Sequence, residues 1–188
     1  IVDGTDRPKS PPHRRDRRPL RLGAGRLWTG VAAERRSTGG TAAPVSALRA
    51  IQQQSDLLLG RGPTAFRARL IALRGHPVIA NQWAAWCEGC RYEFPFFQRA
   101  AGRDGARVAF LGVDARDSTS DATAFLQSFP VPYPSYNDPN GAIARLFKGG
   151  VYWPTTAFYS ASGALLNTHI GAYASQAALD ADIRTYAR

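Results

Sequence analysis

Residues 81–95 of the chain read NQWAAWCEGCRYEFP and contain both of its cysteines, Cys87 and Cys90. An apolar run of strand length, residues 77–83, leads into them, and residues 88–102 have the pattern of a helix. The unpaired N–H groups and positive dipole end of that helix would stabilise a Cys87 thiolate, which is the attacking form of cysteine. The spacing predicts an exposed nucleophile at Cys87, with Cys90 one turn on as a partly buried resolving thiol.

The rest of the chain alternates between strand and helix patterns. After two leading helices the order is β, α, β, α, α, β, β, α. This order predicts an α/β sandwich with a mixed central sheet, parallel at first and completed by an antiparallel hairpin. The predicted elements are helices 46–59 and 64–74, strand 77–83, helix 88–102, strand 107–113, helix 120–129, an extended piece after residues 130–134, a helix from Asp138 to Phe147, strands 155–160 and 164–170, and helix 175–186.

Composition and charge divide the chain into two parts. Hydrophobic residues make up 44% of the 188 residues, which is enough for a packed core, and two cysteines are too few for a disulfide-rich scaffold. The net charge of +10 lies entirely in residues 1–76, which hold 15 Lys/Arg and 5 Asp/Glu, because residues 77–188 hold 9 of each. We predict a disordered basic tail or linker over residues 1–44 and one folded domain over residues 45–188, with its core at residues 77–188.

The basic tail has two functional interpretations. It could be an arm that binds nucleic acid or an anionic membrane surface, or it could be a solvated linker. Aromatic residues are not interleaved with the arginines of residues 14–18, and no groove-reading module is visible. We therefore favour the linker and expect no nucleic-acid partner.

The segment 81–95 resembles the active-site segment of thioredoxin-fold proteins, and it is most similar to the TlpA/ResA-like branch of redoxins. Pro95 falls where that family has a kinking proline inside the helix. Residues 153–156 (WPTT) match the place of the family's cis-proline loop, and the 67-residue gap from Cys87 to Pro154 fits the branch's central α/β insertion. The resemblance covers residues 64–188 and implies a thioredoxin-like α/β sandwich with that insertion.

The resemblance also implies an activity and a site. Cys87 and Cys90 would form a redox-active disulfide couple for thiol–disulfide exchange. A cis bond before Pro154 would turn the Trp153 backbone toward the Cys87 sulfur, where it could pair with an extended substrate segment. We expect substrate contacts from four residues in all: Trp86, Trp153, Pro154 and Thr155.

Three residues of the motif are expected to adjust its chemistry. Glu93 matches a glutamate that ResA-like proteins place near their cysteines, and a half-buried carboxylate there could accept and return the Cys90 proton. Its alternative is a solvated helix residue. Glu88 would either tune the redox potential or serve as a favourable first-turn acid on the helix dipole, and Gly89 loosens the turn between the cysteines.

The same residues bear on four other functions. Direct thiol peroxidase activity remains the main alternative, although that chemistry needs Thr and Pro ahead of a single cysteine, where this chain has Trp-Ala-Ala-Trp. A zinc site would need His76 and His169 beside the cysteine pair, but they are 93 residues apart with no knuckle spacing. Attachment of a c-type haem is excluded, because it requires histidine directly after the second cysteine and this chain has Arg91 there. A non-catalytic binding module would be expected to lose a cysteine.

Partners and compartment follow from the resemblance. We expect no dissociable cofactor and no metal, protein thiols or disulfides as substrates, and an electron-donor redox protein that could be membrane-bound. The family implies an extracytoplasmic protein, membrane-anchored or secreted, and we expect a monomer. No run approaches 18 apolar residues, and since the chain begins at Ile1, a signal or anchor could lie upstream.

Overall fold

The computed structural model describes residues 46–60 and 62–188, so the tail predicted over residues 1–44 lies outside the described residues. The helices are α1 (Ala47–Gln52), α2 (Gly62–Ala72), α3 (Glu88–Asp104), α4 (Thr119–Ser128), α5 (Gln176–Tyr186) and the 3-10 helix η1 (Ala144–Phe147). The strands are β1 (Leu58–Leu59), β2 (Val78–Trp83), β3 (Ala109–Ala115), β4 (Ser135–Asp138), β5 (Thr155–Tyr159) and β6 (Leu165–Ile170).

The described residues form one six-stranded sheet in the order β1-β4-β3-β2-β5-β6. Strands β1, β4, β3 and β2 run parallel, whereas β5 is antiparallel to β2 and β6 is antiparallel to β5. The predicted mixed sheet is therefore confirmed. In the central strand β2, Asn81 pairs with Gly112 of β3 and with Thr156 of β5, so these three residues share one face of the sheet.

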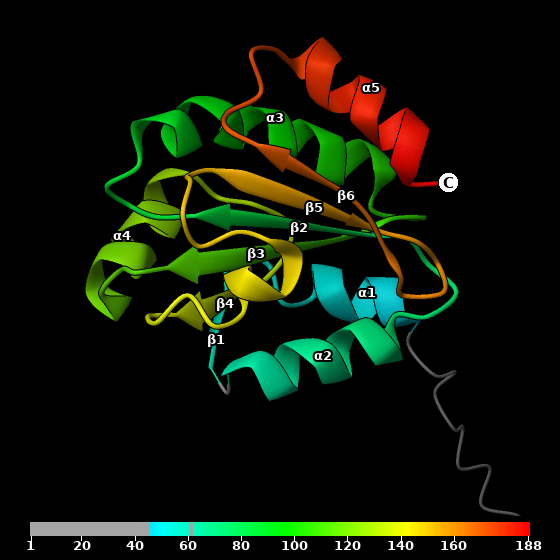
Figure 1. Ribbon diagram of the computed structural model, residues 1–188, viewed down its shortest axis with the longest axis horizontal. Coiled ribbons are helices and arrows are strands. Elements are labelled where there is room, and N and C mark those ends of the chain that lie inside the picture. Colours follow the sequence, from blue (N-terminus) through cyan, green and yellow to red (C-terminus); the bar gives the residue numbers. More distant parts are fainter. Residues whose placement is uncertain (1–45, 61) are drawn as a thin grey trace, which may run out of the picture. The chain divides into compact units, whose positions relative to one another are not determined.

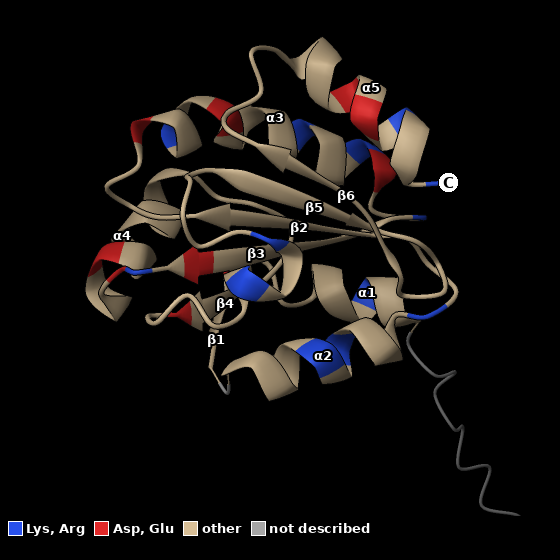
Figure 2. Cartoon of the chain, viewed as in Figure 1, with Lys and Arg blue, Asp and Glu red and all other residues tan. Residues whose placement is uncertain are grey.

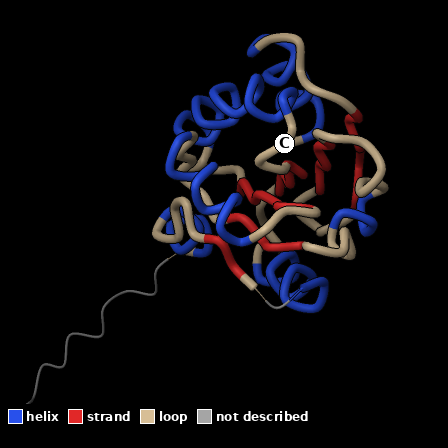
Figure 3. Tube along the Cα trace, turned by 90° about the vertical axis from the view of Figure 1, so that its left-hand side faces the viewer, coloured by secondary structure: helices blue, strands red, loops and turns tan. Residues whose placement is uncertain are grey.

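Helices cover both faces of this sheet. Figure 1 shows α3 and α5 on one side of the strands and α1 and α2 on the other, and the turned view of Figure 3 shows the strands between helices. Helix α4 packs against α3, where the rings of Phe94 and Phe125 lie 4.8 Å apart. On the opposite face, the ring of Phe66 in α2 lies 6.4 Å from that of Phe147 in η1. The core thus lies in two apolar layers, one on each side of the sheet.

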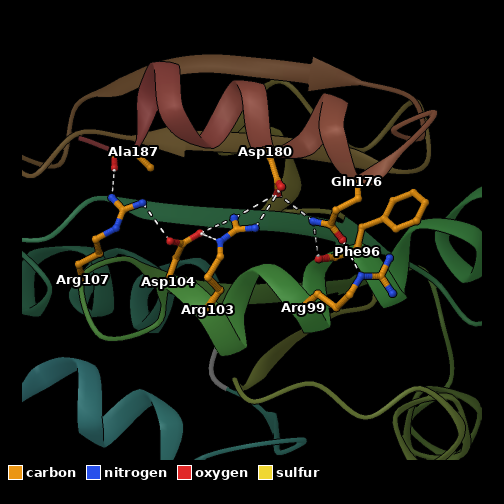
Figure 4. Close-up of polar contacts among 8 residues, drawn as sticks. All are labelled: Phe96, Arg99, Arg103, Asp104, Arg107, Gln176, Asp180 and Ala187. Carbon is orange, nitrogen blue, oxygen red and sulfur yellow. Dashed lines mark hydrogen bonds and ion pairs between the residues drawn. The ribbon is translucent and has the colours of Figure 1, made fainter.

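Charged side chains lie mainly on helices and loops, and the strands are largely uncharged (Figure 2). A polar network joins α3 to α5 at the end of α3 that is far from the cysteines (Figure 4). Arg103 of α3 contacts Asp104 at 2.6 Å and Asp180 of α5 at 3.0 Å. Because Arg103 is half exposed, each pair contributes about 1 kcal/mol or less to stability. The network helps to fix the orientation of α3, which begins at the dithiol.

The first predicted helix, over residues 46–59, is wrong in length. Helix α1 ends at Gln52, and Asp56 then adopts a left-handed backbone conformation with a φ of 58°. The Asp56 carboxylate accepts a hydrogen bond from the backbone N–H of Val131, which ties this turn to the segment ahead of β4. A turn held by a carboxylate ends the helix, and the next residues form β1, an edge strand paired with β4 that the sequence did not predict.

The helix predicted from Asp138 to Phe147 is also shorter, because only the 3-10 helix η1 forms. The N-cap of η1 is Ile143 and not Asp138 as predicted, although the Asp138 Oδ2 accepts the N–H groups of Ile143 and Ala144, both at 2.9 Å. Gly141 has a φ of 64°, so the residues between Asp138 and η1 form a turn and not a helix. The other predicted elements lie within two residues of the observed bounds.

Candidate functional site

Both cysteines lie at the start of α3, as the motif predicts. Cys87 is the N-cap of this helix and is joined to Cys90 by a disulfide. The Cys87 Sγ also accepts a hydrogen bond from the backbone N–H of Cys90 at 3.1 Å. A sulfur in this position takes up one of the unpaired N–H groups of the helix end and lies at its positive dipole end. The same contacts would favour the thiolate over the neutral thiol once the disulfide is reduced.

The two cysteines are more deeply buried than the sequence predicts. Cys90 is completely buried, and Cys87, expected to be exposed, is only 5% exposed. The sulfur of Cys87 is turned toward the helix end, where it contacts Cys90, so little of it reaches solvent. The resolving position is still the more enclosed of the two.

The loop from Trp153 to Thr155 lies beside the dithiol. The Trp153–Pro154 peptide bond is cis, as the resemblance implied. An added Cβ at Gly89 would lie 3.3 Å from Pro154 Cδ and 3.3 Å from Ala172 Cβ, so the segment between the cysteines packs directly on this loop. Thr155 is buried, and its hydroxyl donates to the Tyr152 carbonyl at 2.8 Å, so its side chain is engaged within the protein.

An aromatic surface flanks Cys87. Trp86 is 56% exposed, and its ring lies 5.2 Å from that of Trp153. The guanidinium of Arg116 lies over the Trp153 ring at 5.5 Å, and the Arg116 carbonyl accepts the indole N–H of Trp86 at 3.2 Å. Arg116, which the sequence did not single out, connects the two tryptophans through one residue of the loop between β3 and α4.

Glu93 is completely buried instead of half-buried as expected, and burial rules out its solvated alternative. Its Oε1 accepts the side-chain N–H of Asn81 at 2.8 Å, and its Oε2 accepts the backbone N–H of Tyr173 at 3.0 Å. Burial raises the pKa of Glu93 to about 7, although both hydrogen bonds act to lower it. Asn81 also donates to Thr156 Oγ1 at 3.1 Å, while its own Oδ1 has no partner.

A second buried carboxyl group, Asp114 at the end of β3, was not singled out from the sequence. Burial and the nearby Asp117 raise its pKa to about 8, against a hydrogen bond from the Asn137 amide at 3.3 Å. Its Oδ1 has no hydrogen-bond partner. The only signal for it was an acid at the end of an apolar run, a pattern that also fits a strand reaching solvent.

Two further candidate residues are Glu88, which lies between the two cysteines, and His169. Glu88 is exposed in the first turn of α3. His169 stacks on Tyr173 with ring centroids 3.9 Å apart and lies 3.7 Å from Asp182. Within the part of the chain that the structure describes, no three His, Cys, Asp or Glu side chains are grouped as a metal site would require.

An open pocket of about 450 Å³ adjoins the dithiol loop on the side of α4. The ring of Phe125 in α4 forms part of its lining, together with charged side chains from α3, α4 and the loop before α4. Its lining includes Ala85, Trp86, Arg91, Asp117, Asp121 and Phe125.

Comparison with solved structures places the fold in a class. A secreted disulfide oxidoreductase of Mycobacterium tuberculosis, described as homologous to DsbE of E. coli, matches with 27% identity and a TM-score of 0.54, over 61% of this chain and 85% of that one. The DsbF structure from the same bacterium matches with 26% identity and a TM-score of 0.56, over 61% and 84%. The chain thus has a thioredoxin-like fold, as predicted.

Sequence comparison then gives the family. The model of the AhpC/TSA family matches residues 64–167, and the chain belongs to this family. The thiol:disulfide interchange protein DsbE of Pseudomonas fluorescens biotype C is 33% identical over 101 residues, which are 53% of this chain and 54% of that protein. The thiol-disulfide oxidoreductase ResA of Oceanobacillus iheyensis is 28% identical over 127 residues, 66% of this chain and 60% of that protein.

These matches confirm the resemblance to ResA-like redoxins that was drawn from the segment around the cysteines. The chain spans between half and two thirds of the length of these two relatives, at 54% and 60%. Among the described residues, no helix has both the length and the apolar character needed to cross a membrane.

Proposed function

We propose that the protein is a thiol–disulfide oxidoreductase that reduces or exchanges disulfides of protein substrates through Cys87 and Cys90. The observation that carries the proposal is the position of Cys87 as the N-cap of α3, with its sulfur accepting the Cys90 N–H. That position stabilises the thiolate that attacks a disulfide. The relatives named as thiol–disulfide oxidoreductases support the same activity.

In the reductive direction the reaction needs both sulfurs. The Cys87 thiolate attacks one sulfur of the substrate disulfide, forms a mixed disulfide and releases the other sulfur as a thiolate. Cys90 then loses its proton and attacks the Cys87 sulfur, which releases the second substrate thiolate and forms the Cys87–Cys90 bridge. Two electrons pass from the protein to the substrate, so a dithiol electron donor must reduce the bridge before the next cycle.

The proposed roles of the neighbouring residues follow from their positions. Trp86 and Trp153 offer an aromatic surface beside Cys87, and Pro154 packs on the turn between the cysteines. Glu93 is the buried carboxyl group closest in sequence to Cys90 and, with a pKa near 7, can hold or release a proton at physiological pH. We assign it the transfer of the Cys90 proton, and we assign Glu88 and Gly89 to tuning the redox potential.

The cellular setting belongs to the same proposal. We infer that the protein acts outside the cytoplasm, membrane-anchored or secreted, as a monomer, with an electron-donor redox protein as its partner. The secreted disulfide oxidoreductase among the similar structures supports this setting. We also infer that residues 45–188 are the redox domain and residues 1–44 a linker.

Reduction of insulin by dithiothreitol tests the activity. Wild type should accelerate it, and Cys87→Ser should lower the rate to that of the uncatalysed reaction because the attacking sulfur is gone. Cys90→Ser should instead accumulate mixed disulfides, visible on a non-reducing gel, because the resolving step is lost. Each variant serves as the control for the other. Full activity of Cys87→Ser would contradict the proposal.

A thiol peroxidase is the second candidate, favoured by the match to the AhpC/TSA family. In that reaction the Cys87 thiolate would reduce a peroxide and become a sulfenic acid, which Cys90 would condense to the disulfide with loss of water. Consumption of hydrogen peroxide by the reduced protein separates the two functions. We expect that consumption to be no faster than that of a small-molecule dithiol, and rapid catalytic consumption would favour the peroxidase.

A further inference from the structure

The Ala85 peptide group, two residues ahead of Cys87, is held from both sides. Its N–H donates to Oδ2 of Asp117, and its carbonyl oxygen accepts two hydrogen bonds from Arg91, at 3.1 Å from Nε and 2.6 Å from Nη2. Ala85 lies in the connection that leads from β2 into α3. Hydrogen bonds to charged groups are stronger than neutral ones, so this connection is held more firmly than an ordinary loop.

The two holding residues come from different elements. Asp117 lies in the loop between β3 and α4, where its Oδ1 accepts the N–H of Ser118 at 3.1 Å and so fixes the carboxylate. Arg91 lies one turn beyond the start of α3 and reaches back to the segment before it. The adjacent Arg116 carbonyl holds the indole of Trp86 from the same β3–α4 loop. Ala85 and Trp86 are therefore both anchored on that loop.

We infer that Asp117 and Arg91 are positioning residues for the dithiol, a role that rests on the proposed function. By fixing the Ala85 peptide they hold Cys87 at the N-cap of α3, where its sulfur accepts the Cys90 N–H. The hydrogen bonds of both side chains described above go to backbone groups, so they act through Ala85. Misplacement of a reacting group by about 1 Å can cost as much as about 100-fold in rate.

Arg91 and Asp117 carry opposite charges, so substitutions can separate the effect of holding the Ala85 peptide from the direct effect of charge on the Cys87 thiolate. Loss of the Arg91 side chain would destabilise a Cys87 thiolate whether Arg91 acts by holding the Ala85 peptide or by its positive charge. Loss of the Asp117 charge alone would stabilise the thiolate, because it removes a nearby negative group. Asp117→Asn keeps an oxygen that can accept the Ala85 N–H, whereas Asp117→Ala keeps neither charge nor acceptor. Comparison of these two variants isolates the hydrogen bond.

The experiment is equilibration of each full-chain variant with glutathione buffers at one pH, followed by quantification of dithiol and disulfide forms. A less stable thiolate favours the disulfide form, so Asp117→Ala should shift the equilibrium toward the disulfide by about tenfold relative to Asp117→Asn. Arg91→Met should shift it in the same direction, and Arg91→Lys by less. The double variant Arg91→Met/Asp117→Ala should shift it no further than the larger single effect, because both residues hold one peptide.

The control is Arg99→Met on the same helix. Arg99 is exposed, lies eight residues beyond Arg91 in α3 and donates to Gln176 of α5 at 2.8 Å (Figure 4). It should leave the glutathione equilibrium unchanged.

Two results would overturn the inference: equal equilibria for Asp117→Ala and Asp117→Asn, or additive effects of Asp117→Ala and Arg91→Met. If Asp117→Ala does not fold, as judged by circular dichroism, the comparison of Arg91→Met with Arg91→Gln decides in its place. Both side chains are uncharged and only glutamine can still donate to the Ala85 carbonyl, so equal values would overturn the inference. Failure of wild type to reduce insulin would refute the proposed function, while the glutathione equilibrium would still test the positioning.

Discussion

Glu93 is a carboxyl group with two hydrogen-bond donors and no access to solvent. Its ionised form accepts from Asn81 and Tyr173, but burial outweighs them and raises the pKa to about 7. The neutral form also fits, because Asn81 has a buried Oδ1 without a partner, and rotation of that amide would let it accept from a protonated carboxyl group. Glu93 can therefore change protonation when the Asn81 amide rotates, which suits the proposed role as a proton carrier for Cys90.

The first prediction is that Glu93→Gln removes a pH dependence of stability. Between pH 4.5 and about 7 the native carboxyl group holds a proton that the unfolded chain has released. Glu93 therefore contributes a fall in the free energy of unfolding as pH rises through this window, by about 2–3 kcal/mol at most. The new amide does not titrate and can pair with a rotated Asn81, so urea unfolding at pH 5 and pH 8 should give a smaller fall.

The matched control for this prediction is Glu88→Gln on the same helix. Glu88 is exposed, so this substitution should leave the fall in stability between pH 5 and pH 8 unchanged. An equal fall in wild type and Glu93→Gln would contradict the raised pKa. The reduced Glu93→Gln protein should also show a shifted thiol titration, and an unchanged curve would remove Glu93 from the mechanism.

Residue types and spacing could predict the cysteine pair but not the burial of Glu93. The partners that enclose Glu93 lie 12 and 80 residues away, so a local helix pattern cannot distinguish it from a solvated acid. Arg116 and Asp117 were missed for the same reason, since their importance comes from contacts with residues 85, 86 and 153 that only the fold brings together.

At the scale of elements, strands β2, β3 and β4 are held together by a contact that crosses a glycine. The indole N–H of Trp83 in β2 donates to the Ser135 hydroxyl in β4 at 3.1 Å. Gly112 of β3 lies between them, and a Cβ on it would lie 2.1 Å from Ser135 Oγ and 2.8 Å from Trp83 Nε1. A side chain at this position is therefore incompatible with the hydrogen bond.

We predict that Gly112→Ala lowers the free energy of unfolding by about 3 kcal/mol, because it breaks the Trp83–Ser135 bond and overfills a packed layer. The matched control is Gly102→Ala in α3, where an added Cβ meets nothing within 4 Å. That change should stabilise the protein by about 1 kcal/mol through helix propensity. Urea unfolding measures both effects. If Gly112→Ala left the free energy of unfolding unchanged, the strands would have to be able to shift apart.

Strand and helix patterns could predict most elements because they depend on local periodicity. Strand β1 escaped prediction because two residues are too few for a period, and its pairing partner β4 lies more than 70 residues away. The leucines at positions 58 and 59 were instead counted as the end of a helical pattern. An edge strand of this length exists only through the sheet that it joins.

At the scale of the whole molecule, the sequence places the core at residues 77–188, whereas the fold extends it toward the N-terminus. Phe66 of α2 is completely buried, and its ring lies 5.4 Å from that of Tyr136 in an edge-on contact. Arg69 of the same helix donates to the Tyr136 hydroxyl at 3.0 Å. Without residues 46–76, the face of β4 and η1 that they cover would be exposed to solvent.

The last prediction concerns where the folded domain begins. Deletion of residues 1–44 should leave the melting temperature within about 2 °C of the full chain, since a linker contributes little to stability. Deletion of residues 1–76 should abolish cooperative unfolding, because it removes β1 and the buried ring of Phe66. Phe66→Ala in the chain of residues 45–188 should cost about 3–4 kcal/mol and isolates the contribution of that ring. Calorimetry measures all three, and a chain of residues 77–188 that melts cooperatively near the temperature of the full chain would show that α2 and β1 lie outside the cooperative unit.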